Sequence, residues 1–95
     1  MVEIIWTDFA VEDLHSIHDY ISKDSKYYAD RYIDKLISRV EQLQSHPKSG
    51  RVVPEFEFDN LRELIEGNYR IVYQINKASL SVLKVHHAAR DFKLY

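Results

Sequence analysis

The sequence predicts an α+β fold in which an N-terminal strand and an antiparallel helical hairpin pack on one face of an antiparallel sheet. Two observations carry this prediction. Apolar residues recur at helical spacing through most of residues 8–45, and apolar and polar residues alternate in short runs after residue 60. Because the helical segments are adjacent in the chain and the later strands follow one another, the predicted order is β-α-α-β-β-β. The 95 residues are expected to form a single domain, 1–95.

The first 45 residues are expected to form a short strand followed by a helical hairpin. Alternation over residues 2–6 predicts the strand, and Thr7 can cap a first helix from about residue 8 to 23. Asp24-Ser25 interrupts the helical pattern and caps a second helix that ends near Ser45. So short a connection makes the helices antiparallel neighbours. Their apolar stripes would face the sheet; they comprise Ala10, Leu14, Ile17 and Ile21, then Ala29, Tyr32, Ile33, Leu36, Ile37, Val40 and Leu43.

A turn and a connecting segment then lead into a tight hairpin at residues 61–75. Two runs with a period of two are joined there by Gly67-Asn68, a pair typical of two-residue hairpin loops. A loop of that length sets Glu63 opposite Val72. Arg70 therefore shares a sheet face with Glu63 and Val72, in the middle of a strand whose other residues suit burial.

The last predicted strand covers residues 80–87. A loop of two or four residues before it would place its odd-numbered residues on the Arg70 face. We therefore expect His87 to lie beside Arg70, whereas His86 would lie on the helix-facing side with a structural role. The Arg70 face would be left uncovered by the helices and would carry an apolar floor of Val72, Leu83 and Val85.

Arg70 has two interpretations at this point. An arginine on an apolar floor, beside a histidine and a carboxylate, is typical of a binding surface. The ordinary alternative is that Arg70 is the cross-strand ion-pair partner of Glu63. The spacing of these residues leaves both interpretations open.

Composition narrows the possible functions. The chain contains no cysteine, which excludes disulfides and thiolate metal sites and favours the reducing cytoplasm. No apolar run reaches membrane-spanning length, and the first residues do not form a signal sequence. A net charge of −2 argues against strong nucleic-acid binding through phosphates. His15 and His18 lack an evident third ligand, so neither a metal site nor a cofactor is expected.

Four segments together resemble a known family. They are residues 10–21 (AVEDLHSIHDYI), residues 43–51 (LQSHPKSGR), Arg62-Glu63-Leu64 leading into residues 69–73 (YRIVY), and residues 85–91 (VHHAARD). Their order and spacing resemble the RelE/ParE superfamily of toxins from type II toxin–antitoxin systems, which includes plasmid stabilization proteins. The Arg-Glu pair and the His-Ala-Ala-Arg-Asp ending look closer to the ParE branch. The resemblance covers nearly the whole chain and implies the RelE/ParE-like fold that periodicity predicts.

The resemblance implies a toxin that inhibits DNA gyrase and is neutralised by a cognate ParD-like antitoxin. Antitoxins of this superfamily wrap a C-terminal segment across apolar toxin surfaces, which suggests Val72, Leu83 and Val85 as antitoxin contacts. Arg90 and Tyr95, beyond the last strand, are expected to reach a partner. The implied protein acts in the cytoplasm without a membrane or a cofactor.

The superfamily also implies an alternative, a RelE-like metal-independent mRNA endonuclease. Such an enzyme needs a base, a fixed cation and an acid. Arg70 would be the cation, Glu63 or His87 the base, and His87 or Tyr95 the acid. Against this alternative, RelE-like cleavers are markedly basic and several carry lysines on the strand that here reads Arg62-Glu63-Leu64. A third possibility is an inactive relative that serves as an interaction module.

Overall fold

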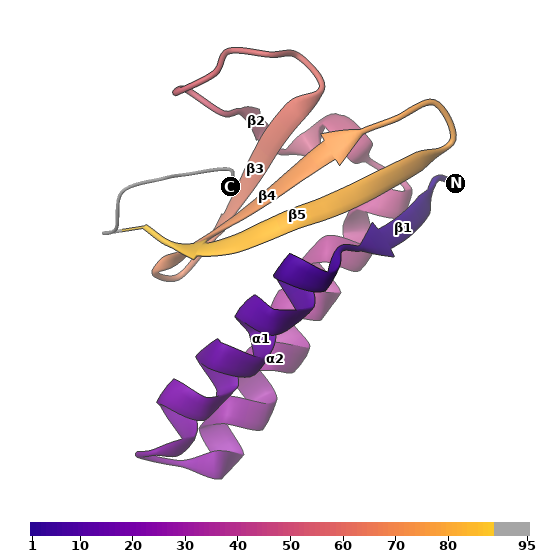
Figure 1. Cartoon of the computed structure of the whole chain (residues 1–95). Helices are drawn as coiled ribbons and strands as arrows, with labels where there is room; N and C mark the ends of the chain where they lie inside the picture. Colours follow the sequence, from indigo (N-terminus) through magenta and orange to yellow (C-terminus); the bar gives the residue numbers. More distant parts are fainter. Residues whose placement is uncertain (89–95) are drawn as a thin grey trace.

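The computed structural model describes residues 1–88 and confirms the α+β class (Figure 1). A first strand leads into two helices, which two short 3₁₀ turns connect to the remaining strands. The elements are β1 (Glu3–Trp6), α1 (Asp8–Ser22), α2 (Lys26–Glu41), η1 (Gln42–Gln44), η2 (Pro47–Ser49), β2 (Arg51–Val52), β3 (Leu61–Glu66), β4 (Tyr69–Ile75) and β5 (Ser79–His87). Among residues 1–88, no helix is both long and apolar enough to cross a membrane.

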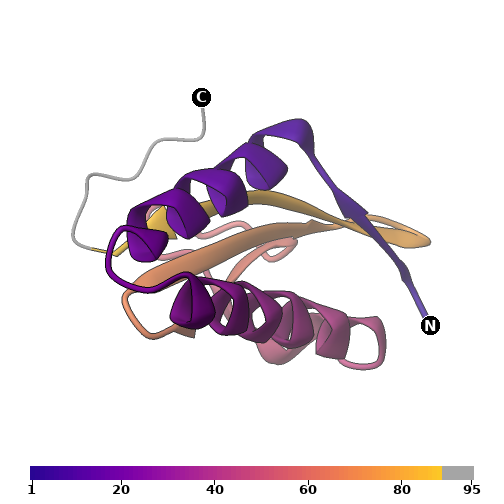
Figure 2. The ribbon, with the colours of Figure 1, turned by 90° about the horizontal axis from the view of Figure 1, so that it is seen from below.

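The helical hairpin begins and turns where the sequence predicts. The hydroxyl of Thr7 accepts a hydrogen bond from the Ala10 amide, and the hydroxyl of Ser25 accepts one from the Tyr28 amide, so both are N-caps. Figure 2 shows the two helices side by side across one face of the sheet. Their apolar stripes pack there against β4 and β5 in the main core, which includes Leu36, Ile71 and Val82.

The sheet is mixed rather than wholly antiparallel. Within the described residues, the strand order is β1-β5-β4-β3-β2, and β1 lies parallel to β5 at one edge. The Thr7 hydroxyl, which caps α1, also donates a 2.8 Å hydrogen bond to the Val82 carbonyl and so ties the end of β1 to β5. The two-residue strand β2 lies at the other edge, at the end of the predicted turn, and pairs with β3.

The β3–β4 hairpin has the predicted register. Glu66 pairs with Tyr69 across Gly67-Asn68, and Glu63 pairs with Val72. Gly67 has a φ of 58°, in the left-handed region that glycine adopts without a Cβ penalty. A two-residue loop leaves no slack for the strands to shift, so the whole hairpin follows from this turn.

The register between β4 and β5 corrects the prediction for the last strand. Near the β4–β5 turn Tyr73 pairs with Val82, but Val72 pairs with Lys84, so β5 carries an extra residue at this point. Because one inserted residue reverses which side chains face each side, the odd and even residues exchange faces beyond the irregularity. His86, not His87, is therefore the partner of Arg70. Val85 lies in the main core beneath the helices and not on the Arg70 face.

Candidate functional site

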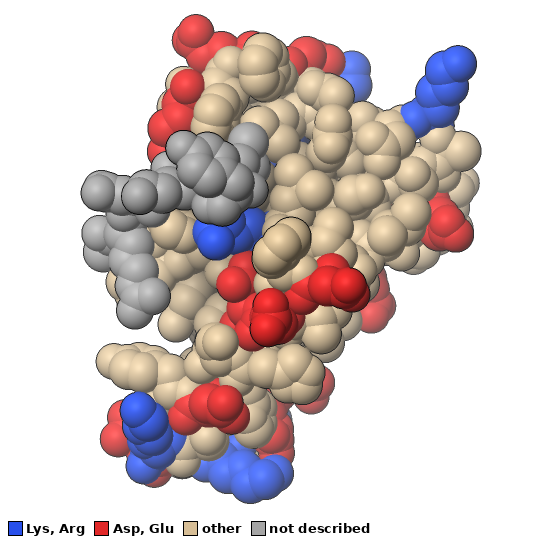
Figure 3. Space-filling view, in the orientation of Figure 1, with Lys and Arg blue, Asp and Glu red and all other residues tan. Residues whose placement is uncertain are grey.

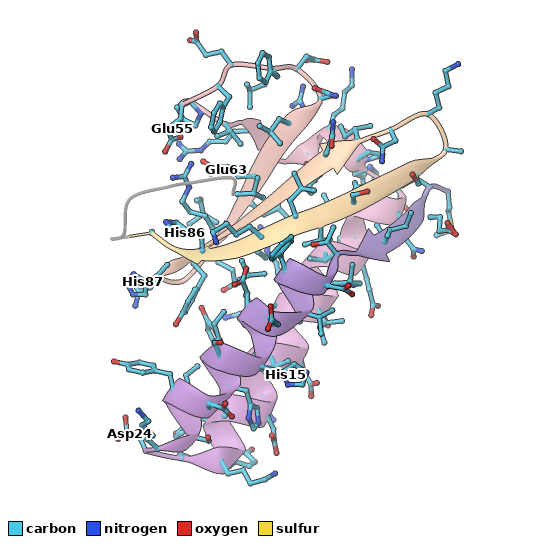
Figure 4. All side chains as sticks on the ribbon, viewed as in Figure 1. His15, Asp24, Glu55, Glu63, His86 and His87 are labelled. Carbon is cyan, nitrogen blue, oxygen red and sulfur yellow. The ribbon has the colours of Figure 1, made fainter. Side chains whose placement is uncertain are left out.

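Arg70 is held by two carboxylates from different parts of the chain. Its Nε donates to Glu63 Oε1 at 2.5 Å, from the neighbouring strand β3. Its two terminal nitrogens donate to the two oxygens of Glu55, each at 2.8 Å. The other oxygen of Glu63 accepts a 2.6 Å hydrogen bond from Nε of Arg51 in β2. We call these four residues, Arg51, Glu55, Glu63 and Arg70, the Arg70 cluster. Figure 4 shows the two carboxylates of the cluster near each other, on the side of the sheet away from the helices.

Burial differs sharply within the Arg70 cluster. The side chain of Glu63 is 0% exposed and that of Arg70 is 10% exposed, whereas the side chain of Glu55 is 42% exposed. Hydrogen bonds from Arg70 lower the pKa of Glu55 to about 2. The hydrogen bonds that Arg70 donates to Glu55 likewise raise the pKa of Arg70, and this effect outweighs the opposing effect of burial. Two cations thus neutralise two carboxylates, which is how a protein tolerates buried charge.

The apolar floor on the Arg70 face is covered, contrary to the sequence prediction. Residues 53–60, here called the strap, connect β2 to β3 and lie on the side of the sheet opposite the helices (Figure 1). Val53 and Phe56 of the strap pack with Leu61, Val72 and Leu83 in a second, smaller apolar cluster. Val72 is fully buried as a result, and Leu83 is partly buried. The strap therefore takes the place that the prediction gave to a partner.

The two histidines of β5 lie on opposite faces of the sheet (Figure 4). His86 is 8% exposed and pairs with Arg70 in the β4–β5 register. His87 pairs with Tyr69, and their rings meet edge to face with centroids 5.2 Å apart. The histidine that could act together with Arg70 is thus His86. The irregularity at residues 82–84 hid this from the sequence, because neither glycine nor proline marks it there.

Sequence reasoning also missed Glu55 and Arg51. It placed Arg70 and Glu63 together correctly, and the register confirms it, but it assigned no form to the segment that contains Glu55. The available signal was a carboxylate three residues after β2 with apolar neighbours, which is too common to interpret alone. Arg90 and Tyr95, the predicted partner contacts, lie outside the described residues.

In this arrangement the groups needed for phosphate chemistry are already engaged. Three nitrogens of the Arg70 guanidinium donate to carboxylates, so a phosphate would have to displace one of them. Both oxygens of Glu63 accept hydrogen bonds from arginines, which keeps the carboxylate away from a substrate. Among residues 1–88, the Arg70 cluster is thus a closed ion-pair network on the sheet.

The surface of α1 is the second electrostatic feature of the molecule, and it is acidic. Within α1 there are four acidic residues, Asp8, Glu12, Asp13 and Asp19, and no lysine or arginine. Figure 3 shows acidic side chains gathered over the start of α1, below β5. This surface repels a phosphate backbone. Among residues 1–88, no group of three or more histidines and carboxylates is arranged to hold a metal ion.

Three comparisons with known proteins agree on the family. The family model for the ParE toxin of the type II toxin–antitoxin system parDE matches residues 4–92. Toxin RelE2 of Caulobacter vibrioides is 32% identical over 91 residues, which cover 95% of this chain and 99% of that protein. A solved structure described as the chromosomal ParDE TA system from P. aeruginosa has a TM-score of 0.76 at 22% identity, covering 92% of this chain and 96% of the other.

The sheet, its helical hairpin and these matches define a class, the toxins of type II toxin–antitoxin systems in the RelE/ParE superfamily. Within that class, the chain belongs to the ParE toxin family. The likeness to the solved structure shows the fold.

Proposed function

We propose that this toxin inhibits DNA gyrase and that a cognate ParD-like antitoxin neutralises it. The observation that carries the proposal is the closed Arg70 cluster. Its cation and its buried carboxylate, the two groups an RNA-cleaving site would use, are bound to each other and to Glu55 and Arg51. A toxin that acts by binding another protein needs no free base or phosphate-binding cation.

Charge supports the same conclusion. The whole chain has a net charge of −2, and α1 adds a concentrated acidic surface. Proteins that bind RNA through its phosphates gain affinity by releasing counterions, which requires clustered lysine and arginine. A gyrase inhibitor is free of that requirement, because its target is a protein.

A cognate antitoxin is supported by the family and by the ParDE system to which the solved neighbour belongs. Of the antitoxin contacts expected from sequence, Leu83 is partly exposed and remains a proposed contact. Val72 and Val85 are buried, at 0% and 4% exposure, so the closed structure does not offer them to a partner. Arg90 and Tyr95 remain proposed partner contacts.

RNA cleavage is the second candidate, and the register of β5 favours it in one respect. It places His86 opposite Arg70, which brings a potential acid or base to the cation that such an enzyme needs. The relative Toxin RelE2 also carries the name of the RelE branch, with which this alternative is associated. Cleavage would require RNA to displace Glu55 from Arg70.

Induced expression in a bacterium separates the candidates. Growth, plasmid topology and the integrity of a long transcript should be followed for the wild type, for His86→Ala and for the matched control His87→Ala. The proposal expects growth arrest and altered plasmid topology with intact transcripts in every culture. Transcript cleavage that His86→Ala abolishes and His87→Ala retains would establish the nuclease instead. Unimpaired growth with the wild type would favour an inactive interaction module.

A further inference from the structure

The helical hairpin extends past the end of the sheet, and its side chains line an open hollow (Figure 1). The hollow has a volume of about 580 Å³, which lies within the range of small-molecule sites in proteins. Most of its lining comes from one flank of α2, and the rest comes from the last turn of α1. The lining residues include Ile21, Tyr28, Arg31, Tyr32, Asp34 and Lys35.

The apolar part of the hollow consists of two tyrosine rings and an isoleucine. The hydroxyl of Tyr32 donates a 2.9 Å hydrogen bond to the Glu66 carbonyl, and its ring packs against Tyr69 with centroids 5.9 Å apart. These contacts hold the Tyr32 ring in place. Tyr28 is 67% exposed, and Ile21 adds an apolar side chain from α1. The hollow therefore offers fixed and accessible surface on which an aromatic ring can pack.

Arg31 differs from the other arginines of residues 1–88, because it forms no ion pair with a carboxylate there. Its guanidinium lies 5.6 Å from the centroid of the Tyr27 ring and donates to the Tyr27 hydroxyl at 3.4 Å, contacts that leave its charge uncompensated. A guanidinium has further N–H donors in a planar fork, which binds a carboxylate bidentately. The arginines of this range that do form ion pairs are Arg39, Arg51, Arg62 and Arg70.

The charge around the hollow suits an anion with a single negative charge. Lys35 and Arg39 share the carboxylate of Glu66, at 3.2 and 3.3 Å, and Asp34 also lines the hollow. With Arg31 these groups comprise three cations and two carboxylates, so one positive charge is left for a ligand. A phosphate monoester carries about two negative charges at neutral pH, so it exceeds this charge and is repelled by Asp34.

We propose that this hollow is a binding site for a small aromatic carboxylate. The carboxylate pairs with Arg31, and the aromatic ring packs against Tyr28, Tyr32 and Ile21. The hollow belongs to the helical hairpin, whereas the Arg70 cluster lies on the side of the sheet away from the helices. The proposal is therefore independent of the toxin's target.

The test uses the full chain and isothermal titration calorimetry at neutral pH, with naphthalene-2-carboxylate as the probe. Its neutral amide has the same rings without the charge, and acetate has the charge without the rings. We expect the aromatic carboxylate to bind at least about tenfold more tightly than either, because only it makes both the charge-assisted hydrogen bonds and the ring contacts. Naphthyl phosphate should bind more weakly than the carboxylate.

Two variants make the result specific to the hollow. Arg31→Gln should weaken binding of the carboxylate at least about tenfold and remove its preference over the amide. The matched control is Lys26→Gln, which removes the same charge from the same helix at a side chain that is 78% exposed and pairs with Asp30. It should change the affinity by less than about twofold. Both positions lie at the surface, so neither change should disturb folding.

Nuclear magnetic resonance of the wild type locates the bound probe. The amide resonances of Tyr28 and Lys35 should shift on addition of naphthalene-2-carboxylate, while the Nε–H resonance of Arg70 stays in place. Four results would each overturn the proposal: equal binding of the carboxylate and its amide, equal losses in the two variants, tighter binding of naphthyl phosphate, or shifts confined to residues outside the hollow.

Discussion

At the scale of single residues, Arg70 is central to the face of the sheet that the strap covers. A guanidinium in a strand centre is stable only when carboxylates replace the water that it loses. Glu63 provides one from the adjacent strand, and Glu55 provides another from the strap. The same contacts determine the protonation of Glu55 and keep the strap over the second apolar cluster.

Removing Glu63 should destabilise the protein far more than removing its exposed partner. Glu63→Ala removes one of the carboxylates that bind a nearly buried arginine, so we expect a loss of about 3 kcal/mol in the free energy of unfolding. Arg51→Ala removes a side chain that is 61% exposed and should cost less than about 1 kcal/mol. Urea unfolding of both variants measures this difference. Equal losses of unfolding free energy would mean that the ion pair of Glu63 with Arg51 stabilises the protein as much as its ion pair with Arg70 does.

The stability contributed by Glu55 should disappear in acid. Arg70 lowers its pKa in the folded protein from 4.5 to about 2, so the unfolded chain takes up the proton first as the pH falls. The contribution is therefore complete above pH 4.5 and is lost as the pH falls towards 2. Since the side chain is 42% exposed, we expect a contribution on the order of 1 kcal/mol.

The control for this effect is Glu55→Gln, because other carboxylates also titrate in the same range. Unfolding free energies of the wild type and the variant should differ at pH 6 and converge near pH 2. A constant difference across this range would contradict the assignment of the ion pair to Glu55.

At the scale of elements, the sequence determines the parts that local rules control. Thr7 and Ser25 mark helix starts because a side-chain oxygen there satisfies a free amide, and Gly67-Asn68 determines the β3–β4 register through a loop with no slack. The β4–β5 register was not predictable from alternation, since one inserted residue exchanges the faces of His86 and His87. The strap was missed because tertiary contacts, not periodicity, hold it.

One tyrosine hydroxyl binds two backbone groups in the connection from α2 to β2. Tyr73 of β4 is fully buried; its hydroxyl accepts a 3.0 Å hydrogen bond from the Gly50 amide and donates one of 2.7 Å to the Pro47 carbonyl. Tyr73→Phe would leave both backbone groups without that partner, and we expect a loss of about 1–3 kcal/mol. Tyr28→Phe, at a side chain that is 67% exposed, should be nearly neutral in the same thermal unfolding assay. If Tyr73→Phe left the stability unchanged, water would have replaced the hydroxyl as the partner of both backbone groups.

At the scale of the whole molecule, the comparisons identify the fold and the family but not the target. The ParE family model spans residues 4–92, and the fold is shared with a solved ParDE system at a TM-score of 0.76. The same fold serves toxins with different targets, so the target must be inferred from the surface. Here the closed Arg70 cluster and the acidic α1 both favour binding to a protein over cleavage of RNA.

The most direct test of this account is a reaction of the purified toxin with purified DNA gyrase and supercoiled plasmid, beside a parallel reaction of the toxin with messenger RNA alone. The account predicts that the toxin blocks supercoiling or traps cleaved plasmid only when gyrase is present, and that the RNA remains intact. The same inhibition should survive His86→Ala, because the proposed mechanism uses no catalytic histidine. Unimpaired gyrase together with RNA cleavage that His86→Ala abolishes would contradict the central claim.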